Sequence, residues 1–99
     1  MFIHLNKDRN VALHEPHDFK RLHIEASDGM TRSEIAAAMA PVATADGDNF
    51  WLSVEALKAL GPADDADWAR NFDAMIASVK KFGWLNEDGT RVRCHLKTN

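Results

Sequence analysis

Hydrophobic and polar residues alternate with two different periods along this chain, and the change of period separates predicted strands from predicted helices. Near the start, residues 2–5 and 11–13 are short apolar runs joined by the polar segment 6–10, which predicts two strands and a turn. Residues 22–26 alternate apolar with polar side chains, the period of a half-buried strand. The first quarter of the chain is therefore predicted to be extended.

Two short helices are predicted in the middle of the chain from their start signals. Thr31 and Glu34 fit a capping box, in which each residue satisfies a free backbone N–H of the other, and this predicts a helix over residues 31–41. Ser53 is a good N-cap residue and begins a second predicted helix over residues 53–60. Between these helices, residues 43–49 are predicted to be a loop because they are mostly small and polar.

A third and longer helix is predicted over residues 65–82. It begins in an acidic segment, where negative charge meets the positive end of the helix dipole. Its apolar residues recur at helical spacing and form one stripe, which we expect to be buried: Trp68, Phe72, Met75, Val79 and Phe82. Gly83 follows as a helix stop signal, and Trp84 is expected to hold the helix end against the next element.

The end of the chain predicts a β-hairpin over residues 84–97 with its turn at 86–89. Neighbouring strand residues point to opposite faces, so the second strand should have an apolar face and a basic face. The apolar set is Val92, Cys94 and Leu96, and the basic set is Arg91, Arg93 and His95. Cys94 is therefore interpreted as a core residue, and it cannot form a catalytic dyad with the adjacent His95.

These elements predict a single α+β domain over residues 1–99, with three helices, a C-terminal hairpin and N-terminal strands. From residue 31 to 97 their order resembles a winged-helix arrangement, and the stretch MTRSEIAAAM resembles the first helix of a helix-turn-helix. The resemblance implies a nucleic-acid-binding fold in which the hairpin is the wing. The connection from Pro41 to Leu52 is longer than the turn of a helix-turn-helix.

Composition and charge narrow the functional classes. The chain has 99 residues, of which 45% are hydrophobic and 27% charged, which is typical of a folded soluble protein. No apolar run is long enough to cross a membrane, and the first residues do not resemble a signal peptide. The single cysteine excludes an internal disulfide. We therefore expect a cytoplasmic protein with no membrane association.

Positive charge gathers near the C-terminus although the formal net charge of the chain is −3. The basic residues that could contact a partner are Lys80, Lys81, Arg91, Arg93 and His95. They could pair with phosphates, but Glu87 and Asp88 lie at the predicted hairpin tip and the rest of the chain is acidic. An ordinary solvated strand face is the favoured interpretation, and nucleic acid is disfavoured by the net charge.

Two other groups of residues are candidates for a site. His14, His17 and Asp18 provide nitrogen and oxygen ligands close together in sequence, but they lack the spacing of a zinc motif and are more simply surface residues. The apolar run 50–52 contains Trp51, which either fills the core or is exposed as an anchor for a partner. The core position is favoured for this run.

The sequence contains no catalytic or cofactor motif, so we expect a non-catalytic cytoplasmic binding or adaptor module, without a cofactor, whose partner is a protein. Two alternatives remain open. One is a winged-helix-type nucleic-acid-binding protein that uses the C-terminal hairpin. The other is a small metal-dependent enzyme built around His14 and His17.

Overall fold

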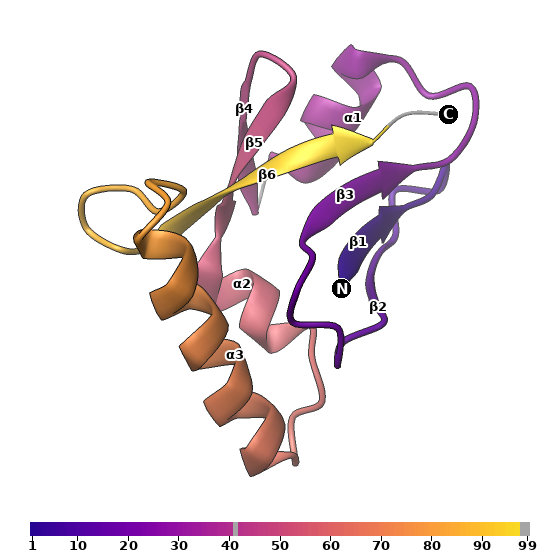
Figure 1. Cartoon of the computed structure of the whole chain (residues 1–99). Coiled ribbons are helices and arrows are strands. Elements are labelled where there is room, and N and C mark those ends of the chain that lie inside the picture. The colour runs from indigo at the N-terminus through magenta and orange to yellow at the C-terminus, as the bar shows by residue number, and fades with distance from the viewer. Residues whose placement is uncertain (41, 98–99) are drawn as a thin grey trace.

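The protein is described from a computed structural model, which covers residues 1–40 and 42–97. These residues form six strands and three helices, whose arrangement is drawn in Figure 1. In chain order they are β1 (Phe2–Leu5), β2 (Val11–His14), β3 (His23–Ala26), α1 (Arg32–Met39), β4 (Ala43–Asp46), β5 (Asn49–Ser53), α2 (Val54–Ala59), α3 (Ala66–Lys80) and β6 (Arg91–Lys97). The three predicted N-terminal strands are confirmed.

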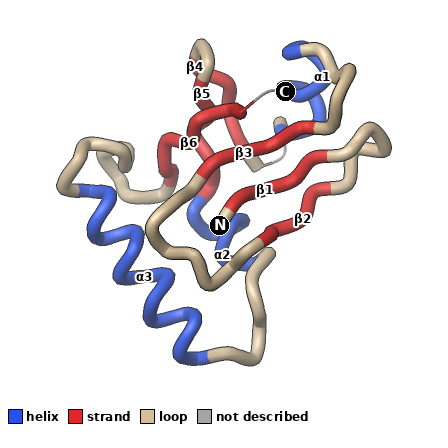
Figure 2. The backbone as a smooth tube through the Cα atoms, turned by 45° about the vertical axis from the view of Figure 1, so that its right-hand side comes forward, coloured by secondary structure: helices blue, strands red, loops and turns tan. Residues whose placement is uncertain are grey.

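All six strands belong to one mixed sheet with the order β2-β1-β3-β6-β5-β4. The adjacent strands β1, β3 and β6 run parallel to one another, whereas the β1–β2, β5–β6 and β4–β5 pairs are antiparallel. Figure 2 shows β2, β1, β3 and β6 side by side. The sheet therefore joins segments from both ends of the described chain.

One face of the sheet forms the hydrophobic core together with the helices. Alternate residues of the strands are buried on this face, including Ile3, Ile24 and Phe50. The buried helix residues belong to the same cluster and are Ile35, Met39, Leu57, Trp68, Phe72 and Met75. Because every helix contributes to this one core, the helical layer covers a single face of the sheet.

The predicted helix starts are confirmed by their cap hydrogen bonds. The Thr31 hydroxyl accepts from the Glu34 N–H at 3.1 Å, and the Glu34 carboxylate accepts from the Thr31 N–H at 3.0 Å. Ser53 and Asp65 cap α2 and α3 in the same manner, each accepting a backbone N–H three residues later. The predicted end of α1 at Pro41 lies outside the described residues. Within the described part of the chain, none of the helices has the length and hydrophobicity to cross a membrane.

The predicted winged-helix arrangement is wrong. Strand β6 is not one arm of an isolated hairpin over 84–97, because it lies in the middle of the sheet between β3 and β5. The expected partner strand is reduced to a single bridge between Leu85 and Val92. Pairing with β5 and β3 provides hydrogen-bond partners for far more of the β6 backbone groups than the two-residue arm Trp84–Leu85 could. It also buries Val92, Cys94 and Leu96 in the core.

The predicted loop over residues 43–49 is also wrong. Strands β4 and β5 form a hairpin here, with pairs running from Ala43–Leu52 to Asp46–Asn49. Gly47 allows the tight turn because its φ of +60° is a conformation that other residues rarely adopt. Strand β4 is at the edge of the sheet, and only its Ala43 is buried, so it needs no bulky apolar side chain and its small and polar residues resemble those of a loop.

The apolar stripe of α3 ends earlier than predicted. Trp68, Phe72 and Met75 are buried, but Phe82 lies beyond the helix and is 69% exposed. Gly83, at φ +75°, redirects the chain. Trp84 then joins the helix end to β6, as predicted, because its N–H donates to the Val79 carbonyl at 3.2 Å and its carbonyl accepts from the Arg93 N–H at 2.7 Å. The Trp84 residue is nevertheless 50% exposed. The rings of Phe82 and Trp84 contact each other, with centroids 5.5 Å apart.

Candidate functional site

The sheet face opposite the helices is the main candidate for a functional surface. Its side chains come from all six strands, and none of them is buried. We call it the open face, and it consists of Phe2, His4, Ala12, His14, His23, Glu25, Thr44, Asp46, Asn49, Trp51, Ser53, Arg91, Arg93, His95 and Lys97. A face that is uncovered and carries aromatic and ionisable groups is suited to binding.

Strand β6 brings basic side chains to the centre of this face. Its burial alternates residue by residue, with Val92, Cys94 and Leu96 inward, as the sequence predicted. Arg91, Arg93, His95 and Lys97 therefore point outward. The alternation follows from the sequence, but the central position follows from the pairing with β3 and β5.

A single row of directly opposed residues crosses the whole open face. In the order of the strands, the residues of this row are His14, Phe2, His23, His95, Asn49 and Asp46. His4 lies beside it on β1, so four of the five histidines in the chain share one face. Sequence reasoning missed this gathering, because the four histidines are far apart in the chain and only strand register aligns them.

Ring contacts hold one half of this row together. Phe2 stacks on His14 with centroids 5.2 Å apart and on His23 at 5.0 Å. His4 also contacts His14, at 5.4 Å. These rings fix each other in position, so this part of the open face presents a continuous aromatic surface.

Glu25 lies beside this row and contacts two basic residues of the open face, His23 and Lys97. Its carboxylate is hydrogen-bonded to the His23 ring at 3.1 Å and lies 3.6 Å from the Lys97 ammonium. The hydrogen bond from His23 is the main reason why the pKa of Glu25 is lowered from its ordinary value, and the charge of Lys97 lowers it further. Lys97 and His23 thus have an internal partner.

Trp51 lies on the open face, whereas its neighbours are buried. Phe50 and Leu52 fill the core, as favoured for this run, but strand alternation turns Trp51 outward. Its indole N–H donates to the Asp46 carboxylate at 3.0 Å, and its backbone carbonyl accepts from the Arg91 guanidinium at 3.3 Å. Trp51 and Arg91 are therefore held by contacts within the sheet.

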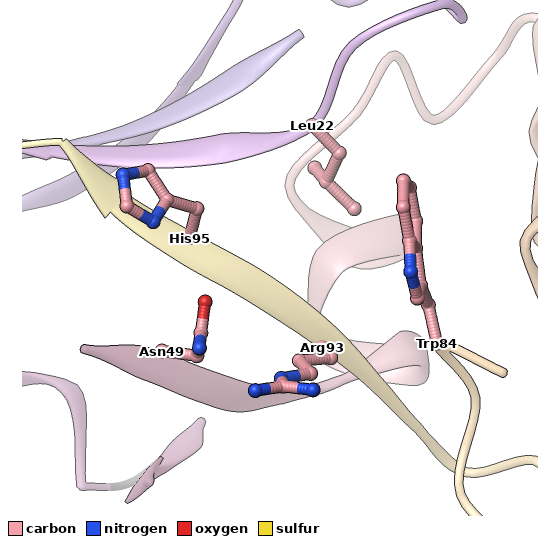
Figure 3. Close-up of a pocket in the computed structure, with 5 residues that line it drawn as sticks. All are labelled: Leu22, Asn49, Trp84, Arg93 and His95. Atoms are coloured by element: carbon pink, nitrogen blue, oxygen red, sulfur yellow. The ribbon is translucent and has the colours of Figure 1, made fainter. Parts of the chain in front are cut away.

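A hollow lies beside Arg93 and His95, and we call it the Trp84 slot. It is lined by Leu22, Asn49, Trp84, Arg93 and His95 and has a volume of about 280 Å³ (Figure 3). Leu22 comes from the segment before β3, and Trp84 from the segment before β6. The structure thus brings together two predicted site residues, Arg93 and His95, with three residues that were not predicted to belong to a site.

Lys80 and Lys81, predicted to extend the basic surface, belong to the end of α3. Lys80 is the last residue of this helix and Lys81 is its C-cap, and both are exposed. They are part of the helical layer and not of the open face. Their position near the helix C-terminus places positive charge where it complements the helix dipole.

The candidate metal ligands His14, His17 and Asp18 each contact a different residue and do not form one cluster. His14 stacks on Phe2, whereas His17 lies 3.7 Å from the Asp65 carboxylate. The Asp18 carboxylate lies 3.9 Å from the Met1 amino group. Within residues 1–40 and 42–97, no three side chains of the metal-binding types are close enough to hold an ion together.

Cys94 is a buried core residue, as the strand pattern predicted. It is 1% exposed, and burial raises the pKa of its thiol from 9.0 to about 12. A thiol in this state is protonated at neutral pH and is not an activated nucleophile.

Comparison of the chain with protein-family models, with curated proteins and with solved structures found no match.

Proposed function

We propose that the protein is a non-catalytic binding module whose open face binds an acidic segment of a partner protein. The observation that supports this most strongly is the place of β6 in the sheet. Its side chains Arg91, Arg93, His95 and Lys97 project from a central strand, on the face opposite the helices. A guanidinium on such a surface can form paired hydrogen bonds with a carboxylate.

The charge of the open face favours an acidic protein segment over nucleic acid. Arg91, Arg93 and Lys97 are its permanent cations, and they are opposed by the carboxylates of Glu25 and Asp46. Nucleic-acid affinity depends on neutralising many phosphates, and the chain as a whole has a formal net charge of −3. A short acidic segment requires only one or two charge pairs together with apolar contacts.

The aromatic side chains of the face suit such a segment. Trp51 and Phe2 are partly exposed, and Trp84 is half exposed at the edge of the face. Tryptophan is favoured in protein interfaces because its large ring provides apolar contact while its N–H remains able to form a hydrogen bond. The proposed partner therefore carries apolar side chains among its acidic residues.

A titration followed by NMR tests the proposal. The isotope-labelled protein is titrated with a short glutamate-rich peptide containing leucine, with a lysine-rich peptide of the same length, and with a short oligothymidylate. The glutamate-rich peptide should shift the β6 amide signals, and the shifts should weaken as salt is raised. Arg91→Ala combined with Arg93→Ala should abolish the effect, whereas Arg70→Ala, on α3, should not.

Three results would contradict the proposal. The lysine-rich peptide could bind as well as the acidic one, the shifts could map to the helices, or no peptide could bind at low salt. Tighter binding of the oligothymidylate than of the acidic peptide would identify nucleic acid as the partner class instead.

A further inference from the structure

The Trp84 slot lies where β6 changes its neighbour along one edge. The first half of β6 is bonded to the segment before it: the Arg93 N–H donates to the Trp84 carbonyl at 2.7 Å, and Leu85 bridges to Val92. The second half pairs with β3, beginning at His23 opposite His95. The slot lies between these two neighbours, so it results from the topology of the sheet.

Three polar side chains line the slot without using their hydrogen-bonding groups elsewhere. Among the residues that the structure describes, the side chains of Asn49, Arg93 and His95 have no hydrogen bond or ion pair. The other arginine and lysine side chains of β6 are engaged: Arg91 with the Trp51 carbonyl, and Lys97 with Glu25. Among the arginines and lysines of the open face that the structure describes, Arg93 is thus the one whose side chain has no polar partner.

The slot also has two apolar walls. Trp84 is 50% exposed, and its ring contacts the ring of Phe82 with centroids 5.5 Å apart. Leu22 is partly buried and packs against the core. Flat rings stack favourably on tryptophan, and a charge-assisted pair with arginine is strongest for a planar carboxylate.

The volume of the slot indicates the size of the chemical group that fits inside it. A cavity of about 150 Å³ is enough for a benzene molecule. At about 280 Å³ the slot has room for one such ring and a small group attached to it. Ligands of drug size occupy larger pockets, from about 300 Å³ upward.

We propose that the Trp84 slot binds a carboxylate attached to an aromatic ring, with the ring against Trp84 and Leu22 and the carboxylate on Arg93 and His95. Asn49 supplies a further amide donor to the same oxygen atoms. This inference rests on the proposed function in taking the open face as the binding surface, and it specifies the chemical group that the slot selects. The source of the group is either a free aromatic acid or a protein chain that ends in an aromatic residue.

The test uses phenylacetate and its neutral counterpart phenylacetamide, which differ only in the charged group. Binding is followed by NMR from the backbone amides of Arg93 and His95 and from the Trp84 indole N–H. The affinity obtained from these shifts should be at least about tenfold higher for phenylacetate than for phenylacetamide, because phenylacetamide cannot form the charge-assisted pair. Equal binding of the two compounds, or no binding of phenylacetate, overturns the inference.

Variants of the slot provide the second arm. Arg93→Ala and Trp84→Ala should each weaken phenylacetate binding by at least about tenfold, because each removes one of the two contacts. Arg70→Ala is the matched control. Arg70 pairs with Asp67 on α3, and this helix contributes no residue to the lining of the slot. Dispersed amide spectra of each variant show that the fold is intact. Unchanged affinity in Arg93→Ala contradicts the inference.

A capped tetrapeptide ending in phenylalanine, with its terminal carboxylate free or amidated, distinguishes the two sources. Tighter binding of the free-carboxylate peptide than of phenylacetate indicates a protein chain end, and weaker binding indicates a small aromatic acid. If the glutamate-rich peptide binds the open face but neither aromatic carboxylate does, this inference fails and the proposed function stands. If phenylacetate binds and the glutamate-rich peptide does not, this inference stands and the proposed function fails.

Discussion

The indole ring of Trp68 packs directly over the α-carbon of Gly61. A β-carbon at Gly61 would overlap the ring, lying 2.6 Å from Cζ3. The ring has no room to move, because its N–H donates to the Pro16 carbonyl at 2.7 Å and its face stacks on Phe72. This contact fixes the start of α3 against the end of α2 and against the N-terminal segment.

Gly61→Ala should therefore lower the free energy of unfolding by about 1–3 kcal/mol, the range for overpacking a core. Denaturant unfolding followed by tryptophan fluorescence measures the change. Ala63→Ser, at an exposed position of the same loop, is the control and should change the free energy of unfolding by less than about 0.5 kcal/mol. An unchanged midpoint for Gly61→Ala would show that the ring is not held as described.

Removing the capping box should weaken α1. Thr31→Ala loses the hydroxyl that accepts from Glu34 N–H, and the expected loss in the free energy of unfolding is about 1 kcal/mol. Thr31→Ser keeps the hydroxyl and serves as the control. Equal stability of the alanine and serine variants in urea would contradict the importance of this cap.

Cys94 should make the protein less stable in alkali. An unfolded thiol ionises above about pH 9.0, whereas burial raises the pKa of the folded one to about 12. The protonated thiol therefore contributes fully to the free energy of unfolding below pH 9. This contribution is lost progressively as the pH rises toward 12, by up to about 1.4 kcal/mol per pH unit. The difference in unfolding free energy between the wild type and Cys94→Ala, measured across this range, isolates the effect.

Glu25 should titrate at a lower pH than an ordinary glutamate. Its lowered pKa means that its contribution to stability is present above about pH 4.5 and is lost as the pH falls through the lowered value. His23→Ala removes the main cause, so the pKa of Glu25 should rise in that variant. Carboxyl carbon NMR measures it directly. A larger rise in Lys97→Ala than in His23→Ala would reverse the assignment of the cause.

The helices could be predicted because their signals are local. Thr31, Ser53 and Asp65 cap their helices through residues only three positions away, so a short window of sequence contains the whole interaction. Phe82 failed as a core residue because the helix ends at Lys80, after which the helical spacing no longer defines a face.

The sheet order and the open face could not be predicted, because they depend on contacts between distant segments. The pairing of His23 with His95 joins residues from opposite ends of the chain, and no local pattern specifies it. The outward position of Arg93 could be predicted from alternation alone. Its proximity to Leu22 and Asn49 requires the strand order, so the slot was not visible in the sequence.

The central place of β6 has a consequence for how the molecule forms. Among the described strands β6 is the last to be synthesised, yet it separates β2-β1-β3 from β5-β4. Until it inserts, each group has an unpaired edge facing the gap, and such edges promote association between chains. Folding to the native sheet must therefore await the final strand, and a nascent chain stalled before residue 91 is the species most exposed to aggregation.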